Sequence, residues 1–256
     1  MKIATWNVNS LRVRLEHVSE WLQRVDPDVL GLQETKLVDE KFPVTDFEEM
    51  GYKTVFSGQP TYNGVALISR EPAKDIATEL DGFPDSEKRV LAATFGDVRV
   101  LNLYVPNGRS VDSEKYQYKL DWLRALNAQL QKDVKLYKHI VAMGDFNIAP
   151  EDRDVHDPSE WEGKILCSQK ERQALVEILS VGFKDTYRLF DQEENPFSWW
   201  DYRAAAFRRN MGLRIDLILA SDAMSSRCTA CTIDIEPRKL ERPSDHTPVF
   251  AEFRDD

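Results

Sequence analysis

Short apolar runs rich in β-forming residues alternate along the chain with segments in which leucine and valine recur at helical spacing. The runs that predict strands are residues 2–8, 28–33, 52–57, 64–69, 89–95, 98–105, 139–144, 213–220, 229–235 and 247–253. Helical spacing is clearest over residues 11–25, 120–130 and 175–179, and Gly182 is placed to end the last of these helices. Gly96 and Asp97 separate two strand-like runs and predict a two-residue hairpin turn.

Paired strands with helices before and after them predict an α+β fold. We expect a four-layer α/β sandwich, in which two packed mixed β-sheets are flanked by helices. No repeat, low-complexity tract or linker interrupts the pattern, so residues 1–256 are expected to form a single domain. Residues 150–170, rich in charge and proline, are the best candidate for a long functional loop.

Composition narrows the class of protein. Hydrophobic residues make up 42% of the chain and charged residues 30%, as in an ordinary globular protein with a sizeable core. The chain has neither a secretory signal nor an apolar run of the roughly 20 residues that a membrane span needs, which predicts a cytoplasmic protein without a membrane partner. The three cysteines lack a second ligand pair for zinc and are expected to be buried without disulfides.

Polar side chains follow several of the predicted strands directly. Asn7, Glu34, Tyr104 and Asp145 each come at or just after the end of an apolar run, and Asp245-His246 precedes the last one. Because strand ends hold side chains rigidly, they are good places to build a site. Metal-assisted cleavage of a phosphodiester needs carboxylates for a hard ion, a group that activates water and donors for the phosphate, and these residue types meet all three needs.

The motifs as a set resemble those of the exonuclease III family of apurinic/apyrimidinic endonucleases, within the endonuclease/exonuclease/phosphatase superfamily. The resemblance runs over nearly the whole chain. It rests on Trp6-Asn7, Leu32-Gln33-Glu34-Thr35-Lys36, Asn63-Gly64-Val65-Ala66, Tyr104-Val105-Pro106-Asn107-Gly108, Gly144-Asp145-Phe146-Asn147, Phe197-Ser198-Trp199-Trp200, Leu213-Arg214-Ile215-Asp216 and Ser244-Asp245-His246-Thr247-Pro248.

This resemblance implies a role for each matching residue. Glu34 would be the main ligand of Mg²⁺ or Mn²⁺, with Asn7 and Asp245 beside it. Asp145 would orient or deprotonate the attacking water, and Asn147 would hold that water or a phosphate oxygen; both also belong to the expected ligand set.

Three further residues complete the expected catalytic group. His246 would bind the ion or donate to the phosphate, with Asp216 fixing its tautomer. Tyr104 would donate its phenol to the phosphate or bind the ion, unless it only caps a strand end. Asn9 stands where some relatives place an aspartate, and this neutral amide favours a mechanism with one ion.

The same resemblance implies contacts with double-stranded DNA that carries abasic sites or 3′ ends. Asn107 and Arg109 match phosphate contacts, although Arg109 could be a solvated loop charge, and Lys119 is one of the basic residues that could follow the duplex backbone. Trp199, Leu213 and Ile215 match an apolar slot for a sugar without its base; alternate apolar positions on a strand are also typical of core.

The expected activity is therefore that of a DNA repair nuclease, an exodeoxyribonuclease and apurinic/apyrimidinic endonuclease that leaves a 3′ hydroxyl and works as a monomer. The formal charge of −10 requires the basic groups to gather locally if DNA is the partner. Two alternatives stay open: a phosphodiesterase or phosphatase of the same fold that acts on lipid or inositol phosphates, and a nucleic-acid-binding module with a vestigial site.

Overall fold

The computed structural model describes residues 1–191 and 197–255, which form two six-stranded sheets and a two-stranded ribbon. The strands are β1 Lys2–Asn7, β2 Val29–Gln33, β3 Lys53–Ser57, β4 Val65–Ser69, β5 Lys74–Ala77, β6 Val90–Phe95, β7 Val98–Tyr104, β8 His139–Asp145, β9 Phe183–Asp185, β10 Trp199–Trp200, β11 Gly212–Leu213, β12 Asp216–Ser221, β13 Cys228–Ile233 and β14 Val249–Phe253. The helices are α1 Leu11–Val25, α2 Val44–Glu49, α3 Glu114–Leu136, α4 Pro158–Trp161, α5 Gln169–Ser180 and α6 Asp222–Ser225. In the described ranges, none of these helices is both long and apolar enough to cross a membrane.

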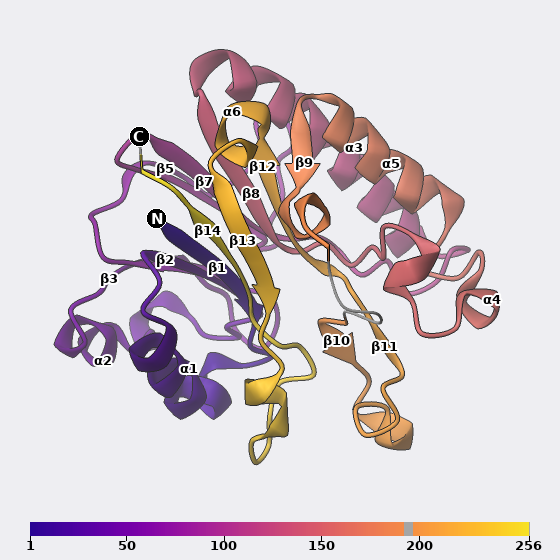
Figure 1. Cartoon of the computed structure of the whole chain (residues 1–256), viewed down its shortest axis with the longest axis horizontal. Coiled ribbons are helices and arrows are strands. Elements are labelled where there is room, and N and C mark those ends of the chain that lie inside the picture. Colours follow the sequence, from indigo (N-terminus) through magenta and orange to yellow (C-terminus); the bar gives the residue numbers. More distant parts are fainter. Residues whose placement is uncertain (192–196, 256) are drawn as a thin grey trace.

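The sheets lie face to face between two layers of helices (Figure 1). Sheet 1 has the strand order β13-β14-β1-β2-β4-β3, and sheet 2 has the order β5-β6-β7-β8-β12-β9. Helices α1 and α2 cover the outer side of sheet 1, and α3 and α5 cover the outer side of sheet 2 (Figure 1). Both sheets mix parallel and antiparallel pairs. The expected α+β fold of four layers is confirmed.

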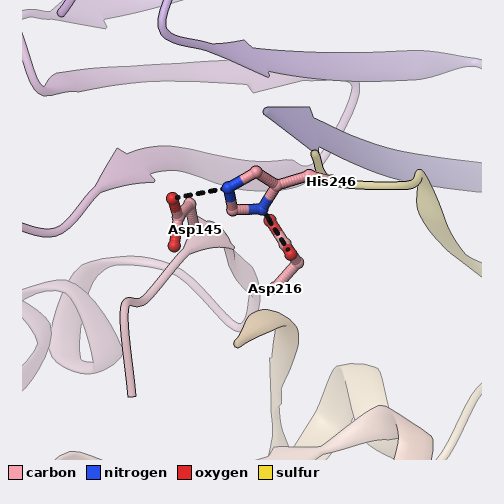
Figure 2. A group of neighbouring side chains, drawn as sticks. All are labelled: Asp145, Asp216 and His246. Atoms are coloured by element: carbon pink, nitrogen blue, oxygen red, sulfur yellow. Dashed lines mark hydrogen bonds and ion pairs between the residues drawn. The ribbon is translucent and has the colours of Figure 1, made fainter. Parts of the chain in front are cut away.

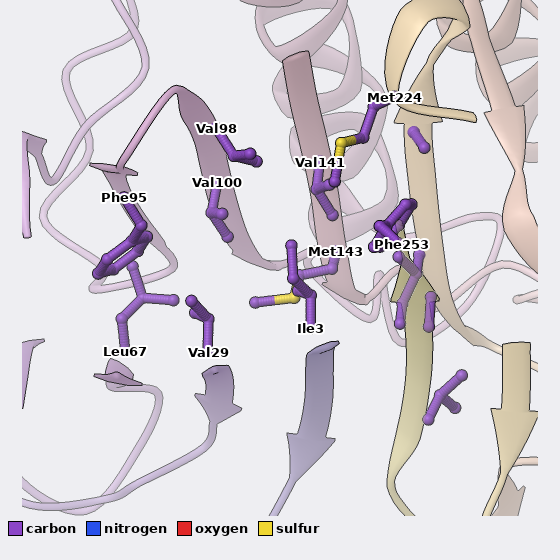
Figure 3. Close-up of a cluster of buried hydrophobic side chains, with 14 of the residues drawn as sticks. Ile3, Val29, Leu67, Phe95, Val98, Val100, Val141, Met143, Met224 and Phe253 are labelled. Atoms are coloured by element: carbon purple, nitrogen blue, oxygen red, sulfur yellow. The ribbon is translucent and has the colours of Figure 1, made fainter. Parts of the chain in front are cut away.

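Three apolar clusters fill the three interfaces between these layers. The central cluster joins Ile3 and Val29 of sheet 1 to Val100 and Met143 of sheet 2 (Figure 3). A second cluster packs α3 and α5 on sheet 2, and a third packs α1 on sheet 1. Since successive side chains of a strand point to opposite faces, strands that are buried on both sides read as the continuous apolar runs seen in the sequence.

A polar bridge crosses the central interface between the sheets. The Asn102 side chain, on β7 and fully buried, donates from Nδ2 to the carbonyl oxygens of Leu32 at 2.9 Å and Ala66 at 2.8 Å. Its Oδ1 accepts from Gln33 Nε2 at 2.5 Å, and the same nitrogen lies 2.8 Å from Thr5 Oγ1. Hydrogen bonds in a dry interior are directional, so this bridge fixes how sheet 2 sits on sheet 1.

The helices begin where the sequence supplies caps. Ser113 accepts a hydrogen bond from the backbone of Tyr116 at the start of α3. Ser168 and Glu171 form a reciprocal capping box at the start of α5. These caps satisfy amide groups that the first helical turn leaves without partners.

The structure departs from the predicted elements in short segments. Strands β5, β9 and β10 were not predicted; β9 and β10 have three and two residues, and β5 is an exposed edge strand with an irregular register. The predicted strand 213–220 divides into β11 and β12, because Leu213 pairs with Trp199 while Asp216 pairs with Asp145 of β8. Residues 150–170 contain α4 and fold back onto Leu213.

Strand direction brings the predicted site residues to one edge of the sandwich. Strands β1 and β2 are parallel, so Asn7 and Glu34 follow neighbouring strand ends in sheet 1. Strands β7 and β8 are also parallel, and Tyr104 pairs in register with Asp145 in sheet 2. The carboxyl ends of these strands lie at the same edge, which is where both sheets contribute side chains.

Candidate active site

Asn7 joins the two sheets at the centre of the candidate site. Its side-chain nitrogen donates to Glu34 Oε1 at 3.0 Å and to Asp145 Oδ2 at 2.9 Å, and its oxygen accepts from the backbone of Asn9 at 3.0 Å. Asn7 is fully buried, so it holds the two carboxylates against each other. Its amide nitrogen, and not its oxygen, therefore faces the carboxylates, and a direct role for Asn7 as a metal ligand stays a prediction.

His246 lies between two aspartates that come from sheet 2 (Figure 2). Its Nδ1 is 2.9 Å from Asp216 Oδ2 and 3.1 Å from Oδ1, and its Nε2 is 3.7 Å from Asp145 Oδ2. Ser198 Oγ donates to Asp216 at 2.7 Å, which fixes that carboxylate in turn. The structure thus brings together the histidine and aspartate that the sequence analysis paired, and directs Nε2 toward Asp145.

Burial and charge together set the protonation of this group. Burial by itself lowers the pKa of His246, but the negative charges of Asp216 and Asp145 outweigh it and raise the pKa well above its ordinary value. Burial also raises the pKa of Asp145, and the imidazolium charge opposes this change. A protonated His246 presents an Nε2–H donor toward the space beside Asp145.

Tyr104 ends β7 beside the carboxylates. Burial raises the pKa of its phenol well above 10, and the charges of Glu34 and Asp145 add to this effect. The phenol is therefore protonated, which suits the predicted role as a donor. The guanidinium of Arg89 lies 4.7 Å from the centre of the Tyr104 ring and 2.5 Å from Glu87 Oε2.

Arg89 lies beside the site although no sequence motif indicated it; the predicted turn at Gly96-Asp97 offered a signal. The strand pairing on either side of this turn, extended to residue 89, places Arg89 opposite Tyr104. The backbone nitrogen of Tyr104 donates to the Arg89 carbonyl oxygen at 2.8 Å. A guanidinium at that position faces the same strand end as the phenol.

Asp245 is connected to the site through Asn9. Its Oδ1 accepts from Asn9 Nδ2 at 2.9 Å and its Oδ2 from Trp199 Nε1 at 3.0 Å. Burial opposes ionisation, but the His246 charge and these two bonds leave the pKa of Asp245 below its usual value. Lys36 Nζ lies 2.5 Å from Asn9 Oδ1 and 3.0 Å from Glu34 Oε2, so an ammonium also borders the carboxylates.

The backbone near these carboxylates adopts unusual conformations. Asn9, Glu34, Lys36 and Asn147 all have positive φ angles, between 44° and 55°. Residues other than glycine rarely occupy this region, and asparagine tolerates it best. Such residues gather at functional sites because packing there imposes a particular side-chain direction.

Asn147 contacts Asn107 at the end of strand β8. Asn147 Oδ1 accepts from Asn107 Nδ2 at 3.0 Å, and Asn147 Nδ2 donates to the carbonyl oxygen of Val105 at 3.0 Å. Asn107 and Arg109 are exposed beside the site and accessible to a ligand. The oxygen of Asn147 is already engaged, and its assignment as a metal ligand stays a prediction.

Lys119 does not reach the surface, and its predicted contact with the DNA backbone is corrected. Its side chain is fully buried and pairs with Glu171 at 2.5 Å. The sequence shows a positive charge on a helix but not which way that helix faces. An ammonium enclosed by the protein cannot contact a phosphate at the surface.

The predicted apolar slot is largely filled. Leu213 is 0% exposed and Ile215 1%, and they pack with Trp199 and Trp161 in one small cluster. The two indole rings meet edge to face with centroids 6.5 Å apart. The three predicted residues do lie together. Leu213 and Ile215 are nevertheless part of the core, as apolar residues at alternate positions of a strand often are.

The donors at this edge fit a hard divalent cation. Glu34, Asp145 and Asp245 offer carboxylate oxygens, which Mg²⁺ and Mn²⁺ prefer. Among the residues that the structure describes, Asp145, Asp216 and His246 present ligand atoms within 4.8 Å of one another. Asp216 is already engaged by His246 and Ser198, so the oxygens of Asp145 and Glu34 are the better candidates.

Known proteins are similar to this chain over its full length. Exodeoxyribonuclease III of Haemophilus influenzae is 36% identical over 99% of this chain and 100% of its own. A 3′ phosphatase from Neisseria, solved with a product DNA hairpin, has 47% identity and a TM-score of 0.98, and an AP endonuclease from Archaeoglobus fulgidus has 44% and 0.95. Both structures are covered completely, as is this chain. A model of the endonuclease/exonuclease/phosphatase family matches residues 4–246, and the chain belongs to that family.

Proposed function

We propose that the protein is a metal-dependent DNA repair nuclease that removes nucleotides or blocking groups from the 3′ ends of double-stranded DNA and also cleaves beside abasic sites. One observation carries the proposal: Asn7 from sheet 1 bridges Glu34 and Asp145, which belong to different sheets, beside a buried His246–Asp216 pair. The relatives support it, since they include an exodeoxyribonuclease, a 3′ phosphatase and an AP endonuclease.

Glu34 and Asp145, with Asp245 nearby, would hold one Mg²⁺ or Mn²⁺ ion. When bound, the ion supplies positive charge that polarises the phosphate and stabilises the leaving oxygen. Lys36 next to Glu34 already provides one positive charge there, and Asn9 is neutral, which favours a single ion. To identify the preferred metal, bound ions are first removed with a chelator. Mg²⁺ or Mn²⁺ is then added back separately, and the restored activities are compared.

The chain's own groups divide the remaining work of an in-line attack by water. Asp145 accepts a hydrogen bond from the water and orients it, and Asn147 lies two residues away at the same strand end. His246 donates from Nε2 and Tyr104 from its phenol to the phosphate oxygens, on which negative charge grows. Asp216 orients the His246 ring and stabilises its positive charge through the bond to Nδ1.

The surface around the site supports DNA as the substrate, although the chain as a whole carries a charge of −10. The arm between β10 and β11 extends beyond the two sheets (Figure 1) and carries the exposed Arg203, Arg208 and Arg209. Exposed Arg109 lies on another loop of the site. Local arginines of this kind contact phosphates without reading sequence.

The filled apolar slot supports a preference for 3′ ends. A flipped abasic sugar needs open apolar surface, whereas Leu213 and Ile215 are buried under Trp161 and Trp199. A terminal nucleotide has no downstream strand to distort and does not need the slot. We propose that abasic-site cleavage is the slower activity and requires Trp161 to move, and that the protein acts as a cytoplasmic monomer.

Two labelled duplexes test the proposal, one with a recessed 3′ end and one with an abasic analogue, with and without Mg²⁺. We expect metal-dependent 3′ trimming that exceeds abasic cleavage and falls at least about a hundredfold in Glu34→Ala. Glu49→Ala, an exposed carboxylate on α2, is the matched control and should match wild type. Preferred hydrolysis of phosphoinositides, or DNA binding without turnover, would support the two alternatives instead. Size-exclusion chromatography with light scattering tests the monomer.

A further inference from the structure

A buried ion pair lies directly behind the loop that carries Asn147. Lys119 of α3 and Glu171 of α5 are both 0% exposed, and Lys119 Nζ lies 2.5 Å from Glu171 Oε1. The same nitrogen donates to the carbonyl oxygen of Asn147 at 2.6 Å and to that of Asn107 at 3.2 Å. All three N–H groups of the ammonium therefore have partners, and two of these are the backbones of residues assigned to the site.

Glu171 is held as firmly as the lysine that it pairs with. Its Oε1 also accepts from the backbone of Leu166 at 3.0 Å, and its Oε2 accepts from the Ser168 backbone at 3.0 Å and from Ser168 Oγ at 2.5 Å. Two buried charges are expensive to remove from water, and apolar residues of similar volume often replace such a pair without loss of stability. A stability role alone is thus a weak explanation for this arrangement.

The contacts of Asn147 point to another role. Its φ angle is 49°, its backbone N–H donates to Asp145 Oδ1 at 2.9 Å, and its side chain accepts from Asn107. Gly108 lets the loop close on the lysine, because a Cβ at that position would lie 3.1 Å from Lys119 Cδ. Lys119 therefore ties the backbones of both asparagines to one fixed point, on the side away from the substrate.

We propose that Lys119 is a positioning residue for the hydrolytic reaction: it fixes Asn147 and Asn107 relative to Asp145, and Glu171 keeps it in place. This inference rests on the proposed nuclease function. It predicts that loss of the pair lowers the rate of the chemical step through misplacement of Asn147, because small displacements in a site cost large factors in rate.

The double variant Lys119→Met/Glu171→Gln tests this without leaving a full buried charge unpaired. We expect the single-turnover rate constant for 3′ trimming to fall at least about tenfold. The dissociation constant for the duplex, measured in EDTA, should rise by a smaller factor through Asn107. Hydrogen exchange of peptides covering residues 145–149 should become faster.

Arg99→Met is the matched control. Arg99 is another buried cation that donates to a backbone carbonyl, that of Asp75 at 2.5 Å, but it lies toward the other end of β7. Urea unfolding should reveal a loss of stability in this control, while its rate constant and the exchange of residues 145–149 stay at wild-type values. A merely structural role of Lys119 would make the two variants behave alike.

A wild-type rate constant in the folded double variant, or unchanged exchange over residues 145–149, would overturn the inference. If the double variant does not fold, Ser168→Ala replaces it, since this change removes the 2.5 Å bond to Glu171 and keeps both charges. Unchanged exchange over residues 145–149 in Ser168→Ala would then count against the proposal. Failure of the wild-type protein to cut DNA would refute the proposed function, whereas the exchange measurement would still decide whether Lys119 positions Asn147.

Discussion

Replacement of Asn102 by leucine separates the polar bridge between the sheets from their apolar packing. Leucine has the same number and branching of side-chain heavy atoms as asparagine, so no large cavity forms, but it can neither donate nor accept hydrogen bonds. Two donations, to the carbonyls of Leu32 and Ala66, and one acceptance, from Gln33, are lost together. Asn102 is fully buried, so water cannot easily take its place.

The magnitude follows from these three bonds. A buried polar group that loses its partner costs about 1–3 kcal/mol, and Gln33 keeps a second acceptor in Thr5, so its share lies at the low end. The three losses sum to about 3–7 kcal/mol, and burial of the more apolar side chain offsets about 1–2 kcal/mol. We expect Asn102→Leu to reduce the free energy of unfolding by about 1–6 kcal/mol.

Urea unfolding monitored by tryptophan fluorescence measures this change. Met143→Leu, a substitution of similar volume in the same interface, is the control and should cost less than about 1.5 kcal/mol. Under conditions where it is folded, Asn102→Leu should also cut DNA at least about tenfold more slowly, because the site takes groups from both sheets. A free energy of unfolding within about 0.5 kcal/mol of wild type would refute the reasoning that this bridge holds the sheets.

Three further outcomes are expected. Gly144→Ala should fail to fold or unfold in far less urea than wild type, because its Cβ would lie 1.9 Å from the Leu103 carbonyl oxygen at a φ of +146°; a wild-type midpoint would contradict this. Burial raises the pKa of Cys167 and of Cys231 to about 12, so at pH 8 only about one thiol in 10⁴ is ionised. Both thiols should therefore react with a disulfide reagent only after denaturation. Rapid labelling of the native protein would show that they are open to solvent. Glu34→Gln should weaken Mn²⁺ binding in calorimetry without DNA by at least about tenfold, and equal affinity would remove Glu34 from the ligand set.

Much of the fold was predictable because its strands are long and buried on both faces. For apolar runs such as residues 139–144, the local sequence is enough to predict a strand. The ends of these strands then place Asn7, Glu34 and Asp145 at one edge of the sandwich. The short strands escaped prediction since two or three residues carry no periodicity. Strand β10 is defined by the pairing of Trp199 with Leu213 across the ribbon, which the local sequence does not specify.

The site was predicted in its residue types more fully than in its contacts. The pairing of His246 with Asp216 followed from the resemblance, and the structure shows it. Lys119 was wrongly predicted to be exposed, because a charged residue in the sequence does not show whether its position on the helix is buried. Arg89 was missed because its contact with Tyr104 depends on cross-strand register, which has to be extended past the turn to be seen.

The position of β14 has a consequence for the synthesis of the protein. Strand β1 pairs with β14, although the two strands lie far apart in the sequence, and the Met1 nitrogen lies 2.7 Å from the carbonyl oxygen of Phe253. Sheet 1 therefore cannot be completed until β14 has left the ribosome, and His246, which lies just before β14, arrives at almost the same moment. A chain that stops before β14 lacks the strand that pairs with β1 on that side of sheet 1, so this sheet and the candidate site beside it are completed together.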